Sequence, residues 1–182
     1  DPKGGSARND TAEYVGGGDG FPFASGQSFS FEYWVKVAPD HASGDGAGIL
    51  VDNYDQSQNR PWYLSRLDGS GDNRVVEIFT RDAANVSKRA GGSTNVVDDQ
   101  WHHVVGIYDA INAQNRLYVD GVWEGTAGGV PAAPYGANSD SFILGNHLNR
   151  TLDAWLDEVA LYDKALDDLD ADGTIDAENR VS

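Results

Sequence analysis

The chain has 182 residues, of which 40% are hydrophobic, and these values predict one folded domain with a substantial core. Asp and Glu outnumber Lys and Arg by 29 to 13, and the net charge of −16 disfavours nucleic acid and anionic lipid as partners. The absence of Cys excludes disulfides and thiolate metal sites, and no apolar run reaches the length of a membrane span.

The chain opens with a polar stretch, residues 1–10, that we expect to form a loose linker. A first strand is expected over 11–15, ended by the glycine-rich run 16–20. The strongest pattern follows at 28–37, where apolar and polar side chains alternate as in a half-buried strand. In this alternation Trp34 falls on the polar face of the strand.

Short strands separated by turn residues continue through most of the remaining sequence, and no long stretch shows helical periodicity. Asp120-Gly121 between two apolar runs predicts a β-hairpin with a type I′ turn. Many short strands with regular turns are typical of an all-β, antiparallel sandwich or jelly roll. The strands are expected at 48–52, 62–67, 75–80, 102–108, 116–119, 122–125, 142–144 and 156–162.

Five segments, taken in order, resemble the laminin G-like branch of the concanavalin A-like lectin/glucanase superfamily. They are FSFEYWVK at 29–36, DQWHHV at 99–104, LYVDGV at 117–122, FILG at 142–145 and LDEVALYDKAL at 156–166. The resemblance implies a jelly-roll sandwich of two curved antiparallel sheets, which we place at 11–169, followed by an acidic tail at 170–182. It also implies a binding module for sugars, proteins or lipids, often with calcium.

Catalysis is not expected from these residues. Glucanase relatives need two carboxylates spaced along one strand face. Glu77 stands alone in its strand, and Asp157 and Glu158 are adjacent, so a regular strand would point them in opposite directions. The same argument separates His102 from His103, which we interpret as structural; lyase chemistry built from Tyr, His and Arg on separate strands stays open.

One candidate calcium site lies in the acidic tail. Asp168, Asp170, Asp172 and Asp176 have the spacing of the first nine positions of an EF-hand loop. Asn179 stands where such a loop needs a bidentate Glu, so a solvated acidic tail is the alternative.

A second candidate calcium site rests on Asp157. We assign its strand face to the core, together with Val159 and Leu161, where a carboxylate needs a partner. The resemblance implies a structural calcium there, with Asp19 and the carbonyls near Gly17 as further ligands. A backbone hydrogen bond at the sheet edge is the alternative to the ion.

The resemblance places ligands on two polar loops, after an early strand and after the Ile-Leu-Gly segment. Amide and carboxylate groups suit sugar hydroxyls, arginines suit acidic substituents, and aromatic rings can stack on a pyranose. The candidate ligand residues are Tyr54, Asp55, Gln58, Asn59, Arg60, Trp62, Asn146, His147, Asn149 and Arg150. Trp34, Trp101 and Trp155 are assigned to the core, whereas Trp123, after the tight turn, is expected to be exposed.

We therefore expect a secreted or cell-surface, non-catalytic module that binds polysaccharide or cell-surface glycan, is stabilised by calcium, and belongs to a larger bacterial multidomain protein. The alternative is a ligand-binding or spacer domain of a calcium-dependent bacterial adhesin that recognises protein or cell-surface glycan. Nucleic acid and membrane insertion are not expected.

Overall fold

The computed structural model describes residues 7–8, 15–19, 26–39, 49–52, 62–67, 74–81, 86–128, 141–147, 150–151 and 154–167. The regular secondary structure in these ranges consists of β-strands alone, which confirms the predicted all-β class. Within them, no helix is long and apolar enough to cross a membrane. Most of the expected linker and the whole expected acidic tail lie outside the described residues.

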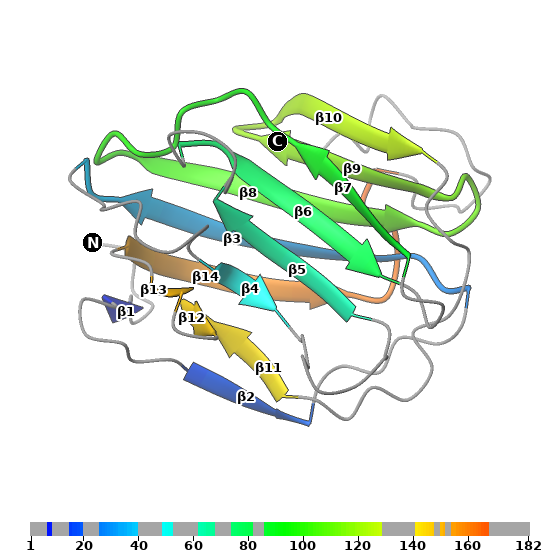
Figure 1. Cartoon of the computed structure of the whole chain (residues 1–182), viewed down its shortest axis with the longest axis horizontal. Coiled ribbons are helices and arrows are strands. Elements are labelled where there is room, and N and C mark those ends of the chain that lie inside the picture. Colours follow the sequence, from blue (N-terminus) through cyan, green and yellow to red (C-terminus); the bar gives the residue numbers. More distant parts are fainter. Residues whose placement is uncertain are drawn as a thin grey trace.

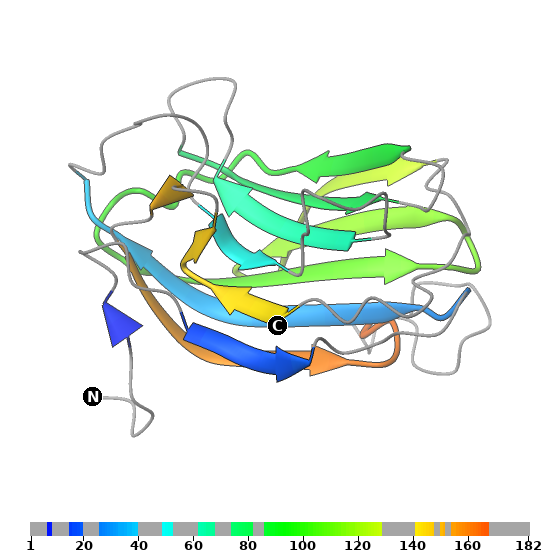
Figure 2. The same ribbon diagram turned by 60° about the horizontal axis from the view of Figure 1, so that its bottom comes forward.

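The strands form two six-stranded antiparallel sheets and a small third sheet. Sheet A has the order β1 (Ala7–Arg8), β14 (Ala154–Tyr162), β3 (Phe29–Val37), β8 (Trp101–Asp109), β9 (Gln114–Val119) and β10 (Val122–Gly128). Sheet B has the order β2 (Val15–Asp19), β11 (Ser141–Leu144), β4 (Ile49–Asp52), β5 (Trp62–Leu67), β6 (Val76–Arg81) and β7 (Ser87–Gly91). The third sheet pairs β12 (Asn146–His147) with β13 (Arg150–Thr151). Sheets A and B stack as two layers (Figures 1 and 2), which confirms the predicted jelly-roll sandwich.

The N-terminal part of the chain differs from its expected pattern. The first strand of sheet B is β2, which begins where the expected strand 11–15 ends and contains the glycine run. An edge strand, paired only with β11, tolerates glycines that a central strand would not. Ala7 and Arg8, inside the expected linker, pair with Leu156 and Trp155 of β14.

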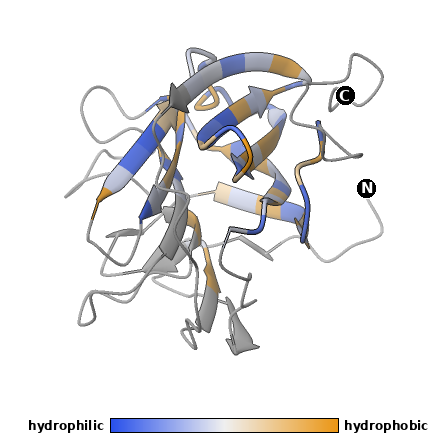
Figure 3. Cartoon of the chain, turned by 90° about the vertical axis from the view of Figure 1, so that its right-hand side faces the viewer, coloured by the Kyte–Doolittle hydropathy of each residue, from blue (hydrophilic) through white to orange (hydrophobic). Residues whose placement is uncertain are grey.

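The core lies between the sheets and is built by alternation along the strands. Phe31, Tyr33 and Val35 of β3 point inward and are buried, and hydrophobic and hydrophilic residues alternate in the described strands (Figure 3). The Tyr33 hydroxyl lies 2.6 Å from the Ser65 hydroxyl of β5, so a hydrogen bond joins the two sheets across the core.

The predicted hairpin between β9 and β10 is confirmed. Val119 lies opposite Val122, and the two turn residues, Asp120 and Gly121, have φ angles of 51° and 73°. Both values are positive, as a type I′ turn requires.

One edge of the sandwich is closed by contact between β7 of sheet B and β10 of sheet A. A side chain at Gly125 would place its Cβ only 2.4 Å from the Gly91 carbonyl oxygen, so the two backbones approach closely. The Glu124 carboxylate accepts hydrogen bonds from the backbone and hydroxyl groups of Ser93 and Thr94. This carboxylate therefore holds the 93–94 turn against β10.

Candidate functional site

The outer face of sheet A, which points away from sheet B, gathers aromatic and charged side chains from three neighbouring strands. Trp34 of β3 lies opposite His103 of β8 and Asp157 of β14. One step along the strands, Lys36 lies opposite Trp101 and Trp155. Because facing residues of antiparallel strands share one side of the sheet, these six side chains form a single surface.

A groove of about 320 Å³ opens in this surface. The described residues that line it are Trp34, Trp101, Asp157 and Glu158. Both tryptophans are 36% exposed, so the prediction that they belong to the core is wrong. Trp34 follows the strict alternation of β3 onto the solvent side, and Trp101 begins its strand at the edge of the core. Trp155 is half-buried on the same outer face, opposite Lys36, so its assignment to the core is wrong as well.

Asp157 faces the groove and not the core, which corrects the strand face predicted for it. Its neighbour Leu156 packs in the core opposite Val35, so Asp157 points to the other side, opposite Trp34. A β-bulge between Asp157 and Ala160 then shifts the alternation and returns Val159 to the core.

The bulge also brings two adjacent carboxylates into one groove. Glu158 has a φ of 48°, in the left-handed region, and its backbone N–H donates a hydrogen bond of 2.9 Å to Asp157 Oδ1. A regular strand would separate the two side chains, and the expectation that they lie on opposite faces is therefore wrong.

The Trp34 side of the groove is supported by a polar chain. The His103 ring packs against Trp34 at a centroid distance of 5.1 Å, and its Nε2 lies 3.1 Å from Glu32 Oε2. The hydroxyl of Tyr162 donates a hydrogen bond to the same carboxylate, and this bond and partial burial raise the Tyr162 pKa to about 12. His103 is thus occupied in a structural role, in line with its interpretation from the sequence.

Asp157 is the predicted calcium ligand that lies in the groove. Asp157 is 7% exposed, and its Oδ2 has no hydrogen-bond partner among the described residues, so contact with a cation would satisfy this oxygen. Calcium takes six to eight oxygen ligands, however, and within the described ranges no group of three or more His, Cys, Asp or Glu side chains is placed so that it could hold a metal ion. The expected partner Asp19 belongs to β2 of sheet B, whereas Asp157 points away from that sheet. Calcium at Asp157 and Asp19 stays a prediction.

Most of the other predicted site residues lie outside the described residues. These are Tyr54, Asp55, Gln58, Asn59, Arg60 and Asn149 in the loops, and Asp168, Asp170, Asp172 and Asp176 in the tail. The backbone of Trp62 begins β5 in sheet B. The backbones of Asn146 and His147 pair with those of Thr151 and Arg150, so the sheet β12–β13 brings three predicted ligand residues together.

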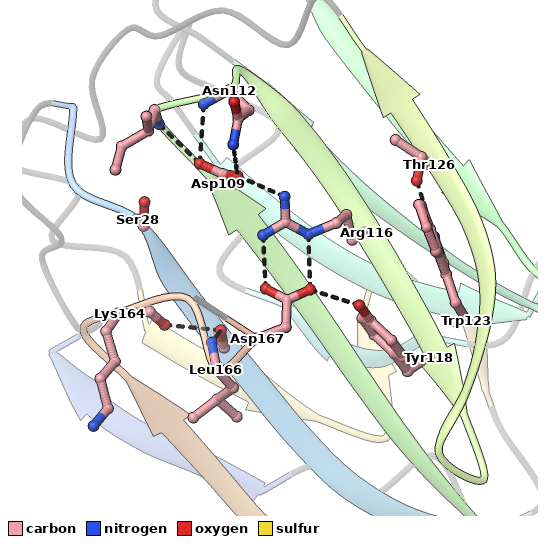
Figure 4. Close-up of polar contacts among 12 residues, drawn as sticks. Ser28, Asp109, Asn112, Arg116, Tyr118, Trp123, Thr126, Lys164, Leu166 and Asp167 are labelled. Atoms are coloured by element: carbon pink, nitrogen blue, oxygen red, sulfur yellow. Dashed lines mark hydrogen bonds and ion pairs between the residues drawn. The ribbon is translucent and has the colours of Figure 1, made fainter. Parts of the chain in front are cut away.

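A second polar cluster is buried under the C-terminal end of the described chain (Figure 4). Arg116 donates to both carboxylate oxygens of Asp167, at 2.8 and 2.6 Å, and to Asp109 at 2.5 Å. Burial alone would raise the Asp109 pKa, but hydrogen bonds from Asn112 and Arg116 outweigh it and lower the pKa. The Tyr118 hydroxyl completes the cluster with a 2.6 Å bond to Asp167. Every charged group here has a partner, so we interpret the cluster as structural.

Glu77, the other acidic candidate, is also engaged. It is buried in β6, and its two carboxylate oxygens lie 3.2 Å from Arg66 Nε and 2.8 Å from Arg89 Nη1. Such an ion-paired carboxylate fits a structural role better than that of a glycosidase acid or nucleophile.

Two stacked antiparallel sheets of this topology define a jelly-roll domain. The chain belongs to the concanavalin A-like lectin/glucanase superfamily, whose laminin G-type family model matches residues 9–171. This confirms the resemblance seen in the five sequence segments. No curated protein sequence matches the chain.

Solved structures with the same fold include three binding domains. The binding domain of Paraclostridial Mosquitocidal Protein 1 has 13% identity and a TM-score of 0.66, with 92% of this chain and 46% of that chain covered. Domain 4 of the Geobacillus stearothermophilus arabinanase AbnA, in complex with arabinotriose, has 18% identity, a TM-score of 0.64 and coverage of 92% and 72%. The Ruminococcus gnavus sialidase CBM40, bound to α2,3 sialyllactose, has 12% identity, a TM-score of 0.61 and coverage of 87% and 94%. The chain spans less than half of the mosquitocidal protein structure.

Proposed function

We propose that this domain is a non-catalytic carbohydrate-binding module whose sugar site is the groove on the outer face of sheet A. The observation that carries the proposal is the pair of partly exposed tryptophans, Trp34 and Trp101, beside two carboxylates in one groove. An aromatic ring offers an apolar face to the C–H side of a sugar, while carboxylate oxygens accept hydrogen bonds from its hydroxyls.

The structural relatives support this choice of ligand class. The arabinanase domain and the CBM40 domain are each solved with a bound oligosaccharide, and the fold is shared over about nine-tenths of this chain. Fold alone does not determine a ligand, so the groove residues of this chain bear the argument.

We further propose that the module works outside the cell, on a polysaccharide or cell-surface glycan, as part of a larger bacterial protein, and that calcium stabilises it. The second candidate function is a domain of a calcium-dependent adhesin. The net charge of −16 and the spaced aspartates from Asp168 to Asp176 favour that alternative.

A glycan array followed by isothermal titration calorimetry tests the sugar site with three variants. Trp34→Ala should abolish binding or weaken it by about tenfold or more, since one lost aromatic stack costs roughly 1–3 kcal/mol. Trp123→Ala is the matched control, because Trp123 is 52% exposed and does not line the groove. Tyr54→Ala examines the predicted loop site.

The outcomes separate the candidate functions. Loss of binding in Tyr54→Ala alone would move the site to the loops. Binding to proteins or cells but to no glycan would favour the adhesin, and shortened oligosaccharide products would identify an enzyme.

A further inference from the structure

The two carboxylates of the groove have no basic partner among the described residues. Asp157 Oδ2 is buried and unpaired, and no ion pair is found for the exposed Glu158 in the same part of the chain. The two described basic side chains beside the groove are engaged elsewhere: Lys36 Nζ lies 3.1 Å from Asp99 Oδ1, and His103 contacts Glu32. Among the side chains that the structure describes, none compensates the negative charge of the groove.

This negative charge lies beside two aromatic surfaces that also attract cations. The indole rings of Trp34 and Trp101 line the same groove, and the face of a tryptophan is the strongest cation–π partner among the aromatic side chains. Lys36 illustrates the effect on this face, since its Nζ lies 5.5 Å from the centre of the Trp155 ring. A small cation in the groove would contact aromatic rings and offset the buried, unpaired oxygen of Asp157 at once.

A neutral sugar would match the aromatic surface of the groove but not the charge of its carboxylates. Its hydroxyls can hydrogen-bond to carboxylates, but they do not compensate a charge that is shielded from water by the groove wall. A protonated amine on the sugar ring supplies the missing positive charge, while the C–H face of the same ring covers the indole surface.

We propose that the groove recognises glycans that carry a free, protonated amino group, with the ammonium beside Asp157 and Glu158 and the sugar ring on Trp34 and Trp101. This inference rests on the proposed carbohydrate-binding function and names its ligand class. The net charge of −16 adds a long-range attraction that salt should weaken.

The test compares three β-1,4-linked oligosaccharides of equal length: one of glucosamine, one of N-acetylglucosamine and one of glucose. Titration calorimetry is carried out on EDTA-treated protein at about pH 6, where the amines of the glucosamine oligosaccharide are mostly protonated. The glucosamine oligosaccharide should bind about tenfold more tightly than the other two, as one desolvated cation–π contact allows. Its affinity should fall with added NaCl, whereas the affinity for the glucose oligosaccharide should stay nearly constant.

Variants of the two carboxylates then test whether these side chains cause the preference for the amine. Asp157→Asn keeps the shape of the side chain and removes its charge, so the preference for the amine should fall close to parity. Asp163→Asn removes one charge from an exposed side chain that does not line the groove, and it should bind like the unmodified protein. If Asp157→Asn fails to fold, Glu158→Gln, at an exposed position, should reduce the preference for the amine in the same way.

Equal affinity for the three oligosaccharides would overturn the inference and leave the proposed function intact. An amine preference that survives in Asp157→Asn and Glu158→Gln, or that needs added calcium, would overturn it as well. Failure of every glycan to bind would refute the proposed function and this inference together.

Discussion

His102 joins two turns of the molecule through its imidazole ring. Its Nδ1 lies 2.8 Å from Asp120 Oδ2 in the hairpin turn, and its Nε2 lies 3.1 Å from Asp98 Oδ1 in the turn before β8. Burial lowers the His102 pKa, but hydrogen bonds and charge from Asp120 and Asp98 raise it more, so the net pKa is above its ordinary value. Only the protonated ring can donate to both carboxylates.

The stability of the protein should therefore depend on pH through His102. A raised pKa in the folded state means that the protonated ring stabilises the fold fully below about pH 6.5, and that this contribution is lost as pH rises through the folded-state pKa. Urea denaturation between about pH 5 and 9 should show a stability gap between the unmodified protein and His102→Gln that narrows with rising pH. If the difference in unfolding free energy between the two proteins stays constant over this range, the protonated His102 ring is not paired with Asp98 and Asp120.

Gly106 of β8 is a position where any side chain would meet the core. A Cβ there would lie 2.4 Å from Phe31 Cζ and 3.1 Å from Ile78 Cγ2. We expect Gly106→Ala to lower the free energy of unfolding by roughly 1–3 kcal/mol, the usual cost of overpacking. Gly91→Ala is the control, because its Cβ would meet only Glu77 Cγ at 3.9 Å. Equal loss of stability in both variants, measured by denaturation, would argue against this packing.

At the scale of secondary-structure elements, the buried cluster around Arg116 fastens the segment after β14 to sheet A. Asp167 reaches Arg116 and Tyr118 of β9, and the Ser30 hydroxyl of β3 donates to the Lys164 carbonyl at 2.8 Å. Ala165 packs in a small buried cluster with Val105, Ile107 and Tyr118. The segment thus covers the outer face of sheet A over Val105, Ile107 and Tyr118, which do not line the groove.

Removing the central cation should detach this segment. Arg116→Met leaves Asp109 and Asp167 buried without their partner, and we expect a loss of about 3–5 kcal/mol in unfolding free energy. Hydrogen exchange of residues 163–167 should accelerate at the same time. Arg89→Met is the comparison and should cost less than Arg116→Met, because Arg89 is half exposed and its partner Glu77 keeps its ion pair with Arg66. Unchanged exchange at 163–167 in Arg116→Met would show that the cluster does not hold the segment.

Strand β3, the β9–β10 hairpin and the bulge of β14 differ in how far the sequence alone predicts them. Alternation along β3 and the Asp120-Gly121 turn were sufficient to predict strands and a hairpin, because both depend on local geometry. The groove was not predicted, because a large apolar side chain such as Trp34 is usually buried, whereas its place in the alternation put it on the solvent face. The bulge at Asp157 and Glu158 has no clear local signal, since a non-glycine residue with positive φ depends on packing around it.

At the scale of the whole molecule, the excess of negative charge makes stability sensitive to cations. Repulsion among acidic side chains opposes the compact state, and an ion bound only by the folded chain shifts the equilibrium toward folding. The predicted calcium ligands of the tail, from Asp168 to Asp176, lie outside the described residues, and adding the ion measures their contribution.

Calcium should raise the melting temperature of the chelator-treated protein. At a calcium concentration of about 100 times the dissociation constant, one site would add roughly 2.7 kcal/mol of stability. Differential scanning calorimetry with calcium, with magnesium and with EDTA provides the measurement. A midpoint that does not move after exhaustive chelation and calcium addition would count against any structural ion.

The contact between Gly91 and Gly125 affects how copies of this protein meet in solution. Exposed strand edges offer free backbone N–H and C=O groups to other chains and are a common starting point for aggregation. Here the terminal strands of the two sheets, β7 and β10, lie against each other with their backbones in close approach, and Glu124 holds the neighbouring turn in place. Copies of the protein that meet at high concentration are thereby kept from joining into a continuous sheet along this side.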